Sequence, residues 1–320
     1  MTRHDDVPAA GSTASGRAIP WWAALLIGVG AALAGLLPWV ITGMRLPLQN
    51  LWASATPPGG MPIALLPFSQ YAITLIVGLL VVGPAIGGLV VRLLRERMPR
   101  PRTALVLVGI VAVQFTAIVQ TASVVVAGLQ RRSESGFYVV ALTLVAVLAA
   151  GFGILTFFLI AKAPRAGAVA GLSIAALALG PWLSALIVPF GTVASNEVYA
   201  FLGWLRWIPP VLVGLAIAWG GIDTVGRVVA GLFGLLLVWI VPAIQTGIFN
   251  AAGSRVLAND LGEMREYGLA VFVAALTRPE IAIPPLAVAI LVAAIGLVVR
   301  AVGARGRTTG APAATARDSA

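Results

Sequence analysis

The stretch Ala117-Ile118-Val119-Gln120-Thr121 places a side-chain amide and a hydroxyl inside an apolar run, residues 103–128. That run is long enough to cross a bilayer as a helix, which takes about 20 residues. The chain nearly repeats the stretch at Ala243-Ile244-Gln245-Thr246, within a second such run. The repetition predicts a duplicated membrane protein with a matching polar spot in each half.

The composition of the 320 residues supports a membrane protein. Hydrophobic residues make up 60% of the chain and charged residues only 10%, whereas a soluble domain is about half apolar and about a quarter charged. A water-soluble core could not bury so many long apolar runs, because too little polar sequence would remain to cover them. We therefore expect an all-α, polytopic transmembrane helical bundle of about eight spans.

The positions of the apolar runs divide the chain into two halves. We expect residues 1–18 to be a disordered cytoplasmic tail, 19–161 a first four-helix half and 162–167 a cytoplasmic linker. Residues 168–299 form a second four-helix half, in which the sixth span begins near Phe201, and 300–320 form a second disordered tail. The expected spans are 19–41, 71–91, 103–128, 137–161, 168–190, 201–222, 228–249 and 281–299.

The second half contains an outer loop, residues 250–280. Its charged residues come first, and the apolar segment 267–276 that follows is too short to span a bilayer. The pattern predicts an outer-surface helix followed by a cap that packs over the bundle, which could serve as a lid or as a partner site.

The basic residues predict the orientation in the membrane. With both termini in the cytoplasm, 14 of the 21 Lys and Arg residues fall inside and the other 7 outside. Short cytoplasmic loops carry such an excess, and the segment 92–102 contains five arginines. Because this bias explains the net charge of +10, we expect no nucleic-acid partner. Basic charge is almost all Arg, which together with abundant Ala and Gly is typical of GC-rich bacterial coding, so we expect a bacterial plasma membrane.

Further landmarks recur in the same order in both halves. Pro38-Trp39 matches Pro181-Trp182 at a shift of 143 residues, and Gly87-Gly88 matches Gly220-Gly221 at a shift of 133. The shift is 125 for the Gln-Thr pairs and 143 again for Gly153 and Gly296. Four helices per half predict a parallel repeat with a two-fold axis along the membrane normal. The alternative is chance, because apolar helices use few residue types.

The sequence contains little of the chemistry that catalysis needs. No carboxylate lies inside an expected span, which argues against a proton-coupled pump. There is no Cys and the single His is His4, so neither a metal site nor a Ser/His/Asp triad is supported. The Gly-rich segments do not form a phosphate loop. We expect a protein that is not an enzyme and that needs no cofactor and no metal.

Uncharged polar residues remain as the candidate site. Thr116, Gln120 and Ser123 share one helix face at spacings of four and three residues. Gln245 and Thr246 follow Pro242, which frees a backbone carbonyl one turn earlier. One interpretation is a central polar pocket toward the outer face, lined by all five residues. The alternative is that both glutamines bond to neighbouring helices and fix their packing.

These patterns favour a permease-like protein for a small or amphiphilic solute, with the lipid bilayer and that solute as partners. The alternative is a non-catalytic structural or assembly subunit of a cell-envelope complex, which would bind an envelope protein through its outer loops. A third hypothesis, a lipid-processing enzyme, requires Asp260, Glu263 and Glu266 to converge at a membrane-level cleft.

Overall fold

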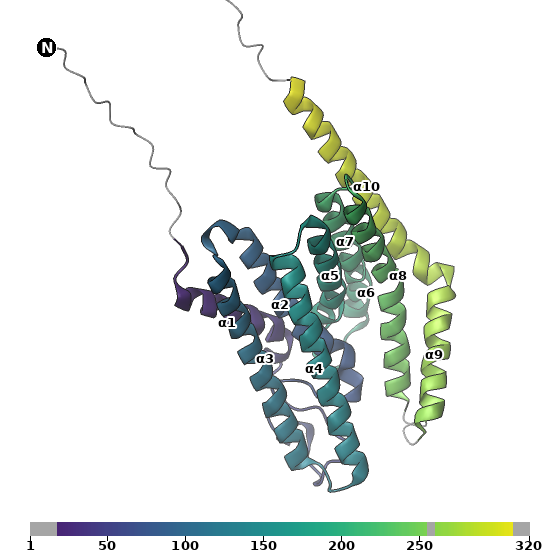
Figure 1. Cartoon of the computed structure of the whole chain (residues 1–320). Coiled ribbons are helices and arrows are strands. Elements are labelled where there is room, and N and C mark those ends of the chain that lie inside the picture. Colours follow the sequence, from purple (N-terminus) through teal and green to yellow (C-terminus); the bar gives the residue numbers. More distant parts are fainter. Residues whose placement is uncertain (1–17, 255–259, 310–320) are drawn as a thin grey trace, which may run out of the picture.

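The computed structural model describes residues 18–254 and 260–309, and within them eight segments are long and apolar enough to cross a membrane. Figure 1 shows these segments packed as one helical bundle. The structure thus confirms the expected all-α membrane class. The helices of the spans are α1 (Trp21–Val40), α2 (Ile73–Leu93), α3 (Arg100–Gly128), α4 (Ser133–Ala161), α5 (Arg165–Ile187), α6 (Asn196–Leu205) continued by α7 (Ile208–Gly220), α8 (Val225–Gly253) and α10 (Pro279–Thr309).

Prolines mark the starts of several helices. Pro20, Pro99 and Pro164 precede the first residues of α1, α3 and α5, and Pro209-Pro210 occupy the first turn of α7. Proline suits these positions because the first turn of a helix has no use for its backbone N–H groups. The connections 94–99, 162–164 and 221–224 lie at one end of the bundle, here named the arginine face. The connections 41–69, 129–132 and 188–195 define the opposite end, the loop face.

The sixth span differs from the expected single helix. It consists of two helices, α6 and α7, that meet at Arg206 and Trp207. The expected start near Phe201 is therefore wrong, because the helix already begins at Asn196. The chain bends where Pro209 and Pro210 cannot donate to the preceding turn.

The segment 250–280 is mostly helical, which corrects the expected outer loop. The helix α8 continues to Gly253, and α9 (Leu261–Thr277) includes the whole apolar segment that was expected to be a cap. Figure 1 shows α9 running alongside α8 at the loop face instead of over the bundle. The backbones approach closely because a Cβ on Gly247 would lie 2.9 Å from the carbonyl oxygen of Gly268.

The carboxyl-terminal tail is shorter than predicted. The last helix, α10, continues to Thr309, so residues 300–309 are helical and not part of a disordered tail. Arg300 helps to hold this end, since it donates to the carboxylate of Asp223 at 2.7 Å, and Arg227 donates to the same oxygen at 2.6 Å. The predictions for 1–17 and 310–320 concern segments outside the described residues.

The same helix neighbours occur in both halves of the bundle. In the first half α2 packs against α1 and α4, and α1 packs against α3. In the second half α7 packs against α5 and α10, and α5 packs against α8. Each half thus uses its helices in the same arrangement.

The contacts between the halves do not follow the predicted two-fold axis. The helix α5 packs against both α2 and α4. A two-fold axis would place α1 against α7 and α10 in the same way, because such an interface uses the same surface twice. No comparable contact joins α1 to either helix among the described residues. The halves therefore meet through different surfaces.

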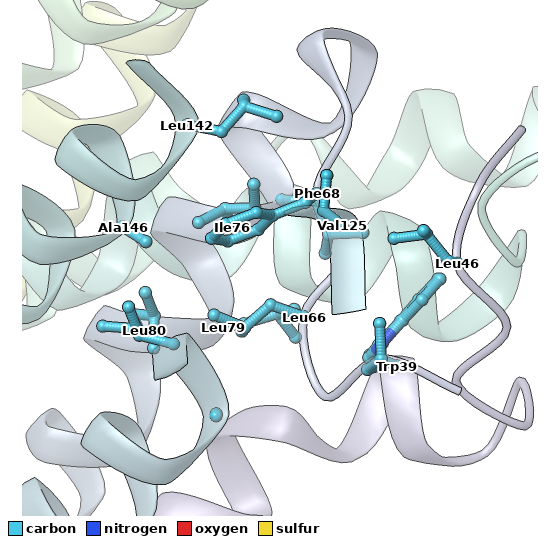
Figure 2. Close-up of a cluster of buried hydrophobic side chains, with 14 of the residues drawn as sticks. Trp39, Leu46, Leu66, Phe68, Ile76, Leu79, Leu80, Val125, Leu142 and Ala146 are labelled. Carbon is cyan, nitrogen blue, oxygen red and sulfur yellow. The ribbon is translucent and has the colours of Figure 1, made fainter. Parts of the chain in front are cut away.

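The connection 41–69 forms the core of the first half at the loop face. Its side chains Leu46, Met61, Leu66 and Phe68 are fully buried. Figure 2 shows this connection inserting its side chains among those of Trp39, Val125 and Leu142, which come from α1, α3 and α4. The connection therefore fills the space between the helices of the first half.

Candidate functional site

A cavity of about 850 Å³ lies at the loop face of the second half. Its walls come from α5, the junction of α6 and α7, the middle of α8 and the start of α10, and the start of α2 closes one side. Ligand sites in proteins range from about 300 to about 1,000 Å³. The cavity is therefore large enough to hold a small solute.

Prolines from four helices line this cavity. They are Pro181, Pro209, Pro210, Pro242, Pro284 and Pro285. Because proline has no N–H, the carbonyl oxygen four residues before it in a helix loses its usual partner. The residues four positions before Pro181, Pro242, Pro284 and Pro285 are Leu177, Val238, Glu280 and Ile281, and all of them line the cavity as well. The walls thus contain backbone acceptors that the helices themselves do not satisfy.

A few polar side chains are distributed over the otherwise apolar walls. Gln245 lies on α8, and Ser184 on α5 donates back to the carbonyl oxygen of Gly180 at 3.1 Å. Arg206 and Glu280 are exposed and carry opposite charges. The guanidinium of Arg206 lies 4.7 Å from the ring centroid of Trp207, within the range of a cation–π contact.

Of the five predicted site residues, Gln245 lines the cavity and the other four do not. Thr246 is exposed and donates to the carbonyl oxygen of Pro242 at 2.8 Å, which is a bond within its own helix. Thr116 and Ser123 are exposed on the outer surface of α3. The structure therefore does not bring the five residues into one shared pocket.

Gln120 binds the connection 41–69 instead of facing a cavity. Its Nε2 donates to the carbonyl oxygen of Ile63, and its Oε1 accepts from the N–H of Leu65, both at 2.9 Å. Its neighbour Thr121 is fully buried and accepts from the N–H of Leu66 at 2.9 Å. For this glutamine the packing interpretation describes what the structure shows.

The most buried amide on α3 is a residue that the prediction set aside. Gln114 is 3% exposed and donates to the carbonyl oxygen of Leu80 in α2 at 2.7 Å. Its own Oε1 is buried without a hydrogen-bond partner among the described residues. The face of α3 that points into the protein thus runs through Gln114 and Thr121, and Thr116 lies outside it.

The sequence analysis missed most of the cavity. The signal was present in the proline pairs Pro209-Pro210 and Pro284-Pro285, since prolines in membrane helices need neighbours to satisfy the freed carbonyls. A second signal was the apolar segment 61–68 in the first long connection. So apolar a connection is expected to be buried, and it contains the residues that fill the first half.

Acidic residues do not build a catalytic site in the described part of the chain. Asp260, Glu263 and Glu266 are exposed near the start of α9 and none of them lines the cavity. Asp260 caps that helix, because its Oδ1 accepts from the N–H of Glu263 at 2.9 Å. The convergence that a lipid-processing enzyme requires is therefore not found. The described residues also contain no group of three His, Cys, Asp or Glu side chains placed to hold a metal ion.

The fold and the cavity together define a multi-pass helical membrane protein with a solute-sized space at one face. No protein-family model matches the chain, and no curated protein and no solved structure shows significant similarity to it.

Proposed function

We propose that the protein is a permease-like membrane protein that binds a small amphiphilic solute in the cavity between α5, α6–α7, α8 and α10. The supporting observation is the cavity itself, which combines apolar walls with the amide of Gln245 and the opposite charges of Arg206 and Glu280. Apolar walls with a few placed polar groups are typical of small-molecule sites. An amphiphile would place its apolar part among the prolines and its polar part near the charges.

We place the protein in a bacterial plasma membrane with both termini in the cytoplasm. The arginine face would then be cytoplasmic, in agreement with the bias of basic residues toward that side. The cavity would open toward the outside. Because Glu280 is the acidic residue in its lining and lies at the first turn of α10, we propose a facilitator without proton coupling and without a catalytic step.

The two halves are proposed to have arisen by duplication. The repeated pattern of helix neighbours supports this history. Close contacts at glycine also recur at the shifts found in the sequence. A Cβ on Gly88 would meet the backbone of Phe157, and one on Gly221 would meet Arg300, which are the positions shifted by 133 and 143 residues.

A second pair of glycine contacts supports the same duplication. A Cβ on Gly153 would lie 2.9 Å from the ring of Pro84, and one on Gly296 would meet Ala218. The position that matches Pro84 at a shift of 133 residues is 217, next to Ala218. The proposed repeat therefore applies to the arrangement inside each half, whereas the halves join through different surfaces.

The experiment that tests the function fills the cavity. The protein is reconstituted in lipid nanodiscs, and its thermal unfolding is followed with a panel of small amphiphiles. We expect at least one of them to raise the melting temperature of the parent protein but not that of Ser184→Trp, because the indole occupies the cavity. Ser123→Trp is the matched control, since Ser123 is exposed on α3 and does not line the cavity.

Flux separates a permease from a structural subunit. We expect proteoliposomes that contain the parent protein or Ser123→Trp to release the stabilising amphiphile faster than those that contain Ser184→Trp. The proposal fails if no amphiphile stabilises the parent protein, or if Ser184→Trp responds as the parent does. Binding without flux would favour a non-transporting subunit of an envelope complex.

A further inference from the structure

The first half contains a filled counterpart of the cavity. At the shifts of the repeat, the cavity residues Pro181, Pro242 and Gln245 correspond to Pro38, Ala117 and Gln120. In the same way Pro209 and Pro285 correspond to Ile76 and Leu142. Gln120 binds the connection 41–69, and Ile76, Ala117 and Leu142 belong to the core that this connection completes. The matching space in the first half is thus occupied by the protein's own chain.

The occupant of the first half is an extended peptide segment, residues 63–66. Four hydrogen bonds hold its backbone, one to each residue. The bonds join Gln120 Nε2 to the oxygen of Ile63 at 2.9 Å, Trp39 Nε1 to the oxygen of Ala64 at 2.7 Å, Gln120 Oε1 to the N–H of Leu65 at 2.9 Å and Thr121 Oγ1 to the N–H of Leu66 at 2.9 Å. Side chains of α1 and α3 therefore bind this segment as a neighbouring strand would, through its backbone.

The glutamine forms two of these bonds with a single planar group. Its N–H donates to a carbonyl oxygen, and its oxygen accepts from the N–H two residues later in the segment. This pairing satisfies the backbone of an extended chain at a spacing of two residues, as a neighbouring strand does. The same geometry does not suit an alkyl chain, which has no donor and no acceptor.

The second half keeps the glutamine but lacks the segment. Where the first half has the long connection 41–69, the second has the short connection 188–195 followed by α6, none of whose side chains is buried. Gln245 faces the cavity and forms no hydrogen bond with the residues that the structure describes. Its amide thus remains available to a ligand.

The prolines of the second half add acceptors to this site. The carbonyl oxygens of Leu177, Val238, Glu280 and Ile281 lose their helical N–H partners, and all four residues line the cavity. An apolar environment makes an unpaired carbonyl costly, so these groups favour a ligand that brings N–H donors. A lipid tail brings none, whereas every residue of a peptide except proline brings one.

We infer that the cavity of the second half binds an extended apolar peptide segment of about four residues, whose backbone pairs with the amide of Gln245 as residues 63–66 pair with Gln120. The inference rests on the proposed function and names the class of its solute. The peptide's N–H groups meet the carbonyl oxygens freed by proline, and its side chains occupy the apolar walls. The charges of Arg206 and Glu280 lie where the ends of the segment would emerge.

The test uses the sequence of the first-half segment as the probe. The peptide acetyl-Ile-Ala-Leu-Leu-amide is titrated onto the full-length protein in nanodiscs, and its affinity is measured by the shift in melting temperature and by calorimetry. A depsipeptide of the same sequence, with an ester oxygen in place of the N–H of the first Leu, removes the donor to the glutamine oxygen. An alkyl glucoside of similar length represents the lipid-like ligand.

We expect the peptide to bind the parent protein and to bind Gln245→Leu about tenfold more weakly, which corresponds to one lost hydrogen bond in an apolar site. The depsipeptide should bind the parent protein about tenfold more weakly for the same reason. The matched control is Thr246→Val, because Thr246 is the next residue and points away from the cavity. Its affinity for the peptide should equal that of the parent protein.

Other outcomes separate the two proposals. If the alkyl glucoside stabilises the protein in a way that Ser184→Trp abolishes, and the peptide does not bind, the peptide inference is overturned and the proposed function stands. If neither ligand binds, both proposals fail. Equal affinity of peptide and depsipeptide would overturn the role of Gln245 without any variant, so the test survives even if Gln245→Leu folds poorly.

Discussion

Trp182 of α5 donates its indole N–H to the carbonyl oxygen of Gly35 in α1 at 2.8 Å. The matching tryptophan of the first half, Trp39, donates to Ala64 inside its own half. Where the second half has no internal segment to bind, its tryptophan bonds across to the first half. The same residue type therefore closes a core in one half and joins the two halves in the other.

Replacement of Trp182 by Phe should weaken the contact between the halves. The aromatic ring remains but the hydrogen bond to Gly35 is lost, and such bonds in membrane proteins contribute about 0.6 to 2 kcal/mol. We expect the free energy of unfolding in lipid to fall by that amount. The control is Trp204→Phe, since Trp204 is 74% exposed and its ring nitrogen has no bond among the described residues. Equal losses in the two variants would contradict the assignment.

Gly109 is predicted to tolerate no side chain. A Cβ there would lie 2.5 Å from the carbonyl oxygen of Leu25, so Gly109→Ala must push α3 away from α1. Overpacking of this kind costs about 1 to 3 kcal/mol. Gly151→Ala is the matched control, because a Cβ at Gly151 in α4 meets no atom within 4 Å. Alanine there should leave the stability unchanged or raise it by up to about 1 kcal/mol, as helix propensity predicts.

The two matching glutamines should respond differently to the same substitution. Gln120→Leu leaves the N–H of Leu65 and the carbonyl oxygen of Ile63 without partners, at a cost of about 1 to 3 kcal/mol. Amide hydrogen exchange at residues 61–66 should accelerate in this variant. Gln245→Leu breaks no hydrogen bond among the described residues and should unfold at nearly the parent temperature. A large loss of stability in Gln245→Leu would mean that its amide has a structural partner.

The absence of cysteine allows a direct test of orientation. A single cysteine introduced at Ala55, an exposed position of the connection 41–69, should react in intact cells with a maleimide that does not cross membranes. A single cysteine at Glu96, exposed at the arginine face, should react only after the cells are opened. Labelling of the Glu96→Cys variant in intact cells would reverse the proposed topology.

The spans could be predicted from sequence because apolar length alone identifies a membrane helix. Residues such as Gly128 and Ala161 end both the predicted and the observed helices. The fate of α9 could not be predicted in this way. Its packing along α8 depends on Gly247 and Gly268 meeting across a turn that separates them by 21 positions, and no local pattern encodes that contact.

The candidate site could be predicted only in part, for a related reason. The pattern of α3 and α8 identified Gln120 and Gln245 as unusual residues in apolar helices. What each amide faces depends on the connection before α2, whose residue Leu65 lies 55 positions away from its partner Gln120. Helical periodicity describes one helix at a time, so it could not show that one glutamine is covered and the other open. The cavity-lining prolines likewise acquire a common role only when four helices meet.

The position of the connection 41–69 affects how the protein can be made. A ribosome delivers the chain from its amino terminus at about 5 to 20 residues per second. Every residue that fills the first half lies before or within α4, so this half can complete its core while α5 is still being synthesised. The second half has no such filling segment and packs α5 against the finished α2 and α4. During biosynthesis the first half therefore acts as the scaffold on which the second half, with its open site, is assembled.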